Sequence, residues 1–253
     1  MQKKLLLVPF LLASPLGAYA EEYVDPANVT KLYSQAAILA SGNANVQLQA
    51  QVSGAITETQ SFALLGEVDL VSDGDNANNS FGANYAQSRF QYFHIIDTTS
   101  ESLPSVGFSV DYINVDTEIK NDILSIGAIA SINPKYTAGI LIFPRVGYTT
   151  GNIVLSGVDE DVNGYNAGIF AVKRIGNKGA HLAFIPEYQD MSGDSVDMNN
   201  FAFKAAFNLP INEDRTVWLN TRLDYGKTTM KINNHKLESD WESDVWVGLR
   251  YYF

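Results

Sequence analysis

The sequence predicts an all-β fold: an antiparallel up-and-down β-barrel that crosses a membrane with about 12 strands. Three observations lead to this prediction. Apolar residues recur at every second position through most of the chain, the N-terminus has the form of an export signal, and a strand pattern runs to the last residue. Because successive side chains of a strand point to opposite faces, such alternation gives a sheet with one apolar and one polar face.

The N-terminus has the three parts of a secretory signal peptide. Lys3 and Lys4 provide the positive start, an apolar run follows from Leu5 to Leu12, and Ala18-Tyr19-Ala20 forms a small-residue cleavage site. The apolar run is too short to remain as a membrane anchor. We therefore expect residues 1–20 to be a cleaved signal peptide, 21–31 a periplasmic N-terminal segment, and 32–253 the barrel.

Composition narrows the classes of partner. The chain has no cysteine and a net charge of −11. An exported protein without cysteine is not stabilised by disulfides. The strong negative charge argues against nucleic acid as a partner.

Eleven segments show the strand alternation, and each has roughly the 9–13 residues that a tilted strand needs to cross a bilayer. They are 46–53, 61–71, 85–97, 104–113, 122–132, 135–148, 164–174, 179–189, 201–209, 217–225 and 242–253. Bacterial single-chain barrels normally have an even number of strands. The segment 32–40 (LYSQAAILA) supplies a twelfth strand, although it also fits a short helix, in which case ten strands is the alternative.

The connections between these segments favour a membrane barrel over a secreted β-sandwich. Short connections are expected on one side and longer, acidic loops on the other, which is the outer-membrane arrangement. The short set comprises 57–60, 98–104, 132–135, 174–179 and 209–215. The longer set comprises 72–84, 114–121, 149–163, 190–198 and 228–241.

Aromatic residues of the apolar phase gather at both ends of the strands. Rings at these positions match the headgroup level of a bilayer, where they form girdles. The girdle at the long-loop side would contain Tyr112, Tyr148, Tyr165, Tyr188, Phe201 and Tyr225, and the opposite girdle Phe62, Tyr136, Tyr251 and Phe253.

The final nine residues, VWVGLRYYF, alternate up to Phe253. A terminal Phe preceded by apolar or aromatic residues at alternate positions resembles the C-terminal signature of bacterial outer-membrane β-barrel proteins, porins among them. The stretches SRFQYFHI and LIFPRVGY are also similar to uncharacterised proteobacterial outer-membrane proteins. The resemblance implies a Gram-negative outer membrane as location, and Tyr251 and Phe253 as a signal read by the periplasmic assembly machinery and chaperones. It also implies outer-membrane lipid and lipopolysaccharide as partners, and leaves the oligomeric state open.

Charged residues of the polar phase are the candidates for a functional site, because that phase faces the lumen. Seven of them should lie in the outer half of the barrel: Arg89, Asp111, Arg145, Glu187, Lys204, Arg222 and Asp224. They fit a narrow porin-like channel whose constriction selects small polar or charged solutes. They fit equally a closed structural or surface-interaction barrel, in which ion pairs satisfy the interior. Pro144 and Pro186 lie within strands, where we expect bulges.

An outer-membrane enzyme is the least favoured function. His94 falls in the lipid-facing phase, His181 has no serine nearby in the sequence, and His235 is a lone histidine of an outer loop. The sequence contains no HExxH, GxSxG or P-loop motif. The stretch from Asp73 to Asn76 matches only the start of a calcium loop. We therefore predict no catalytic residues, no metal and no cofactor.

Replacing Phe253 with Asp should lower the amount of barrel in the outer membrane, because it removes the terminal aromatic and puts a charge at the lipid boundary. Heat-modifiable migration of the membrane fraction on gels measures this, with Phe253→Tyr as the control that keeps the ring. Normal outer-membrane levels of Phe253→Asp would contradict the interpretation of the C-terminus.

Overall fold

A computed structural model describes residues 33–72, 83–117, 119–155, 157–233 and 235–253. The predicted signal peptide, the segment 21–31 and the acidic turn at Asp73 lie outside the described residues. Within the described part, no helix is long and apolar enough to cross a membrane.

The alternating segments form strands. Their bounds are β1 Gln35–Ser41, β2 Val46–Thr57, β3 Gln60–Ser72, β4 Ala83–Asp97, β5 Ser105–Asp116, β6 Lys120–Ser131, β7 Leu141–Leu155, β8 Val158–Arg174, β9 His181–Ser192, β10 Val196–Pro210, β11 Val217–Ile232, β12 His235–Glu238 and β13 Glu242–Tyr252. A single 3-10 turn among the described residues, η1 Pro134–Tyr136, precedes β7. It occupies the start of the segment predicted as 135–148, because Pro134 and the side chain of Asn133 cap a turn there.

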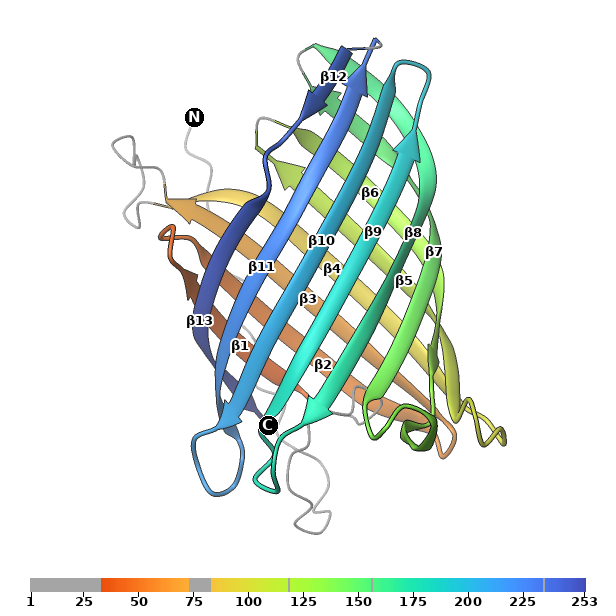
Figure 1. Ribbon diagram of the computed structural model, residues 1–253, viewed down its shortest axis with the longest axis vertical. Helices are drawn as coiled ribbons and strands as arrows, with labels where there is room; N and C mark the ends of the chain where they lie inside the picture. Colours follow the sequence, from red (N-terminus) through yellow and green to blue (C-terminus); the bar gives the residue numbers. More distant parts are fainter. Residues whose placement is uncertain (1–32, 73–82, 118, 156, 234) are drawn as a thin grey trace.

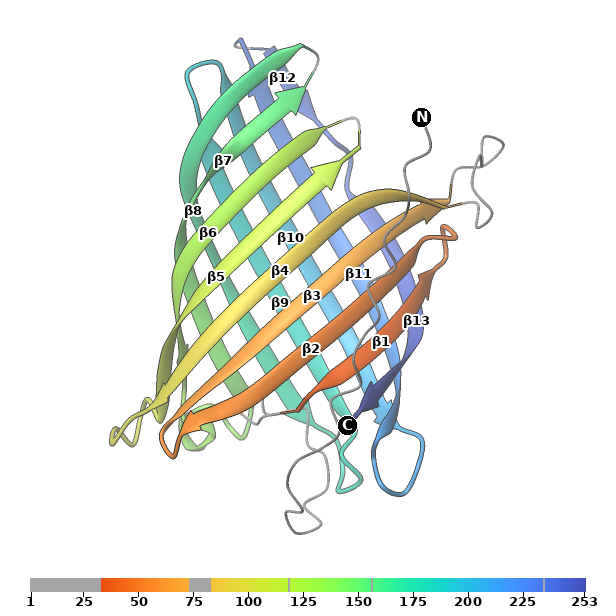
Figure 2. The same ribbon diagram turned by 180° about the vertical axis from the view of Figure 1, so that it is seen from behind.

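The sheet closes on itself. From β1 to β11 each strand pairs antiparallel with the next, and β13 pairs with both β11 and β1 (Figures 1 and 2). β12 pairs with β11 beyond the point where β13 ends, so it prolongs the same ladder after a break at residues 239–241. Among the described residues, twelve strands therefore form one closed antiparallel barrel. The predicted fold class is confirmed, and β1 shows that the helical alternative for 32–40 and the ten-strand count are wrong.

The two ends of the barrel differ in height. We call the end at Gln35 and Tyr252 the terminal rim and the opposite end the distal rim. The hairpins of β7 to β12 rise well above those of β1 to β4, so the distal rim is oblique (Figures 1 and 2).

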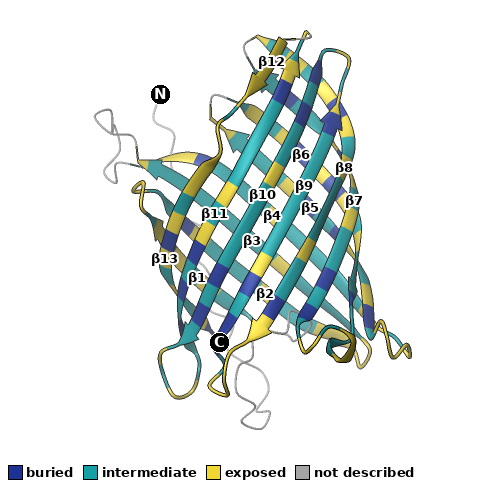
Figure 3. Ribbon diagram, in the orientation of Figure 1, coloured by how far each residue is buried: buried dark blue, intermediate teal, exposed yellow. Residues whose placement is uncertain are grey.

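The outer face has the predicted apolar character. Exposed positions alternate with less exposed ones along strands such as β6 and β13, exposed segments lie scattered along the strands in Figure 3, and the exposed apolar residues include Leu64, Phe90 and Ile126. The predicted girdle residues are also on this face. Their exposed members are Tyr112, Tyr148, Tyr165, Phe201 and Tyr225 toward the distal rim, and Tyr136, Tyr251 and Phe253 toward the terminal rim.

The predicted long outer loops are wrong at four places, the first of which is 114–121, where β5 and β6 pair up to Asp116↔Lys120. β7 and β8 pair up to Leu155↔Val158, β9 and β10 are separated by only residues 193–195, and β11 continues to Ile232. Most of the described residues of 149–163, 190–198 and 228–241 therefore extend the strands, and we call these extensions the distal hairpins. Conversely, the terminal rim has connections of several residues, such as 98–104 and 175–180.

Apolar packing explains why the distal hairpins remain strands. Their inward side chains form one buried cluster, the distal core, in which the strands β6 to β8 face β9 to β11. Its members are Ile123, Ile153, Val162, Met191, Val196, Met198 and Met230. Burying each such side chain contributes about 1.5–3 kcal/mol. The distal core therefore holds the hairpins together and fills this side of the barrel's outer end.

The prolines interrupt pairing without bulges, which corrects our expectation. The ladder between β6 and β7 keeps one register on both sides of Pro144, from Ile129↔Arg145 to the bridge Ile132↔Ile142. Likewise, β8 and β9 keep their register past Pro186. Proline lacks only the N–H, so a gap in the ladder is sufficient, and side-chain phase is preserved beyond both residues.

The side chain of Glu160 links the β7–β8 hairpin to the β9–β10 hairpin. Glu160 of β8 accepts a hydrogen bond from the backbone N–H of Ser195 (2.7 Å) and another from its hydroxyl. These bonds lower the pKa of Glu160, with the hydroxyl as the largest cause.

Glu160→Ala should therefore speed hydrogen–deuterium exchange of the Ser195 amide at pH 7. A carboxyl whose pKa is lowered on folding contributes stability above its ordinary pKa, and this is lost as the pH falls through the lowered value. Wild-type protection should persist at pH 5 and fade only under stronger acid. Protection unchanged in Glu160→Ala would contradict the role of this bond, and Asp159→Ala, on the opposite face of the same strand, is the control.

Candidate functional site

All seven predicted lumen residues face the interior of the barrel. Asp111 and Arg222 are buried, and the other five are of intermediate exposure. Their phase was predictable because no shift of register lies between them and the alternation that defines each strand. The structure does not bring all seven together but divides them into three groups.

The first group is a cluster of two arginines and two carboxylates, which we call the charge cluster. Arg89 binds Asp111 through two nitrogens, at 2.9 Å (Nε–Oδ1) and 2.5 Å (Nη2–Oδ2). Arg145 binds Glu187 directly. Two longer contacts of 3.6 Å, Arg89–Glu187 and Arg145–Asp111, close the ring.

The charge cluster crosses the lumen. Its members come from β4, β5, β7 and β9, and β4 and β9 lie far apart around the barrel. Opposite charges balance within it, and the exposed fractions of the four side chains are between 8% and 21%. Such partly buried pairs are costly to break, because removing one partner leaves a charge without compensation. The charge cluster therefore braces the two sides of this half of the lumen.

The second group is Arg222 with Asp224, whose Nε and Oδ1 are 2.8 Å apart. Arg222 also donates to Gln47 (2.8 Å), and its guanidinium lies 5.1 Å from the ring of Trp246. Gln47 in turn donates to Asp69 (2.7 Å).

A row of glutamine side chains continues this hydrogen-bonded network toward the terminal rim. Gln49 donates to Glu67 (3.0 Å) and accepts from Arg250 (2.9 Å), and Gln35 donates to Gln51 (2.7 Å). The alternation placed Gln47, Gln49 and Gln51 in the polar phase of the segment 46–53, but sequence reasoning did not single them out. The signal was the uninterrupted alternation of glutamine at positions 47, 49 and 51.

The third group is Lys204 alone. Among the described residues it forms no ion pair within 4.0 Å, although Asp69 and Glu187 act on it at longer range. Lys204 lines two cavities of the lumen.

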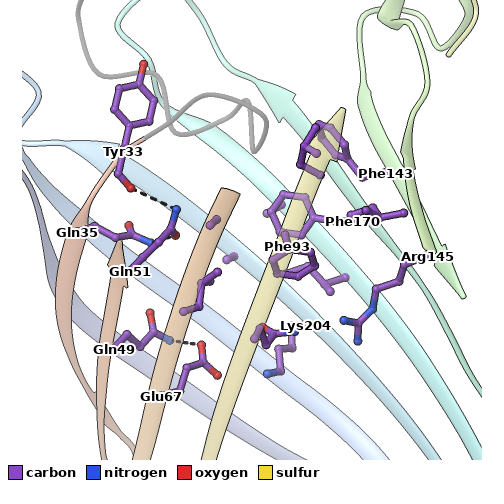
Figure 4. Close-up of a pocket in the computed structure, with 18 of the residues that line it drawn as sticks. Tyr33, Gln35, Gln49, Gln51, Glu67, Phe93, Phe143, Arg145, Phe170 and Lys204 are labelled. Atoms are coloured by element: carbon purple, nitrogen blue, oxygen red, sulfur yellow. Dashed lines mark hydrogen bonds between the residues drawn. The ribbon is translucent and has the colours of Figure 1, made fainter. Parts of the chain in front are cut away.

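The first cavity, which we call the chamber, has a volume of about 310 Å³ and reaches from Lys204 to residues of the terminal rim such as Tyr33 and His181. Its walls differ in chemistry (Figure 4). One wall presents the glutamines with Glu67, and the other presents Phe93, Phe143 and Phe170. Phe143 belongs to a buried apolar cluster with Leu141, Val172, Ala183 and Ala206, and Phe170 packs against this cluster.

The second cavity, the vestibule, has a volume of about 620 Å³. It is lined by β10, β11 and β13 and by the turn between β1 and β2. The small inward residues Ala202 and Gly226, which pair across β10 and β11, leave this space open. Vestibule and chamber thus share Lys204 at their boundary.

The histidines stay apart from these groups. His94 is on the outer face, where it stacks on Phe108, as its phase predicted. His181 is buried at the terminal rim against Trp218, and His235 is exposed on β12. Within the described residues, no group of three His, Asp or Glu side chains could hold a metal ion.

Comparison with known proteins identifies the fold. No family model and no curated protein matches the sequence. A chain solved in work on the in-meso crystallization of membrane proteins is 13% identical, with a TM-score of 0.50 over 87% of this chain and 84% of that one. At this identity the likeness shows the fold alone, a closed antiparallel β-barrel.

Two further structures match with lower scores. The KdgM porin is 8% identical and has a TM-score of 0.45, over 88% of this chain and 99% of the porin. OmpT, an outer membrane protein of Vibrio cholerae, is 8% identical with a TM-score of 0.41, over 88% and 98%. At these identities the likeness concerns the fold alone.

Arg145→Gln should lower the stability of the detergent-solubilised barrel by about 3 kcal/mol, the low end for breaking a buried ion pair, because Glu187 keeps only its 3.6 Å contact with Arg89. Lys120→Gln is the matched control, since it breaks the exposed Lys120–Asp116 pair and should cost under about 1 kcal/mol. Urea unfolding measures both. Equal losses in the two variants would show that the charge cluster does not brace the lumen.

Proposed function

We propose that this protein is a narrow porin-like channel of the outer membrane for small polar or charged solutes. The observation that carries the proposal is that vestibule and chamber both have Lys204 in their lining. Together they trace a route through the lumen: the vestibule lies along β10, β11 and β13, and the chamber, which is lined by residues of β1 to β11 and of β13, continues from Lys204 to the terminal rim. Fixed charges along a narrow route of this kind set ion selectivity.

The filled half limits the width of the route. The distal core, the charge cluster and the apolar cluster that contains Phe143 fill much of the lumen next to β4–β9. A passage narrowed in this way excludes large solutes. The proposed channel is accordingly far narrower than the lumen of large porins, whose sixteen or more strands leave an aqueous pore.

The same filling favours a second candidate, a closed barrel that serves a structural or surface-interaction role. In this alternative the charge cluster and the Gln47–Arg222–Asp224 group would act only to satisfy the interior. An enzymatic role is not part of the proposal. In either function, the partners of the protein would be outer-membrane lipid and lipopolysaccharide, with the barrel-assembly machinery and chaperones during biogenesis.

Refolded protein in a planar lipid bilayer should give small unitary currents, and their absence would favour the closed barrel.

Lys204→Gln should shift the reversal potential toward cation selectivity, because it removes an unpaired positive charge at the boundary of the two cavities. Its urea midpoint should remain near that of the wild type, in contrast to Arg145→Gln. A reversal potential unchanged by Lys204→Gln would place the current path elsewhere.

A further inference from the structure

The lining of the chamber is positively charged, although the chain as a whole carries −11. Five basic side chains line it, namely Arg89, Arg145, Lys204, Arg222 and Arg250, against the two carboxylates Glu67 and Glu187. The vestibule has the opposite balance, with Lys204 and Lys227 against Asp224, Glu242 and Asp244. Three of the five basic side chains are paired with Asp111, Glu187 and Asp224, so the attraction of the chamber for an anion comes from Lys204 and Arg250, and the vestibule in front of it disfavours a solute with several negative charges.

Two of the five cations are not neutralised by a carboxylate. Within the described part of the chain, neither Lys204 nor Arg250 has an acidic partner within 4.0 Å. The Nε of Arg250 is buried and has no hydrogen-bond partner there, while its Nη2 donates to Gln49. Buried donors are almost always paired. The chamber thus contains two positive charges, on Lys204 and Arg250, that no carboxylate of the described residues offsets at close range.

The aromatic wall of the chamber favours an apolar group in the ligand. Phe93, Phe143 and Phe170 line the chamber on the side where Lys204 and Arg145 are drawn in Figure 4. The rings of Phe143 and Phe170 are 6.2 Å apart and tilted by 51°, so they form a continuous apolar surface. Ligand sites combine an apolar surface with a few polar groups in this way, and 310 Å³ falls at the lower end of their usual volume, about 300–1,000 Å³.

We propose that the chamber binds a small amphipathic monocarboxylate. Lys204 holds the carboxylate, Arg250 adds to the positive potential from the glutamine side, and the apolar body of the solute lies against Phe93, Phe143 and Phe170. This inference rests on the proposed function, since it names the class of solute that the passage admits.

The probe for this inference is 3-phenylpropionate, measured by isothermal titration calorimetry on the detergent-solubilised full chain and by block of the bilayer current. Two related compounds separate the contributions: 3-phenylpropanamide keeps the ring without the charge, and acetate keeps the charge without the ring. Both should bind about tenfold more weakly, the size of effect expected for losing a charged hydrogen bond or a buried ring.

Lys204→Met should weaken 3-phenylpropionate binding about tenfold and leave binding of the amide unchanged, because it removes the ammonium and keeps an unbranched side chain only one heavy atom shorter. Lys178→Met is the matched control, since it removes the same charge from an exposed position in the connection between β8 and β9. Heat-modifiable migration verifies that each variant is folded.

The outcomes separate the two proposals. A conducting barrel that binds the amide as tightly as the acid, or whose Lys204→Met variant binds the acid like the wild type, overturns the inference and leaves the channel intact. A barrel that does not conduct overturns the proposed channel. Charge-dependent binding to such a barrel would support the chamber as a site within a closed structure.

Discussion

The pairing of β1 with β13 is the constraint on which the rest of this structure depends. A strand in a bilayer has no water to satisfy its backbone, so every N–H and C=O of the sheet needs a partner strand and the sheet has to close. The seven residue pairs from Gln35↔Tyr252 to Ser41↔Trp246 achieve this closure with the shortest of the barrel strands. Closure creates an enclosed lumen, and the polar phase of every strand then has to be satisfied inside it.

The barrel satisfies its interior in two different ways on its two sides. Beside β4–β9, layers of apolar residues above and below the charge cluster fill the space, and charges meet across the lumen. Beside β1–β3, β11 and β13, polar side chains instead bond to neighbours on adjacent strands, as Gln49 does with Glu67 and Arg250. Because these side chains bond to one another along the barrel wall, the centre of the lumen is not filled, and the chamber and vestibule occupy that space.

The sequence allowed the fold class and the facing of the seven charged residues to be predicted, because both follow from local alternation. Their partners were not predictable in this way. Arg89 and Glu187 meet across the lumen, and no periodic pattern reports a contact between strands five positions apart. Lys204 and Arg222 looked equivalent in the sequence, yet only Arg222 has a carboxylate at 2.8 Å.

The distal hairpins were predicted as loops because they contain acidic residues such as Asp159 and Asp161, which are typical of exposed loops. The inward alternation of Ile153, Val162 and Met191 was the better guide, since those side chains bury one another. The expectation of bulges at the prolines failed for a related reason. A missing N–H removes one bond of the ladder, and the neighbouring pairs hold the register.

The oblique distal rim has a consequence for how molecules arrive. The vestibule is bordered by the low turn between β1 and β2, while the hairpins of β7 to β12 extend well beyond that turn (Figure 1). In the proposed channel, an approaching molecule would enter from the low flank, along the membrane surface, and the tall hairpins would block it from the other flank. Arrival then depends on what diffuses within the thin layer next to the lipid headgroups as much as on the concentration in bulk solution. Neighbouring copies that crowd the low flank would slow entry, whereas those behind the tall hairpins would leave it unaffected.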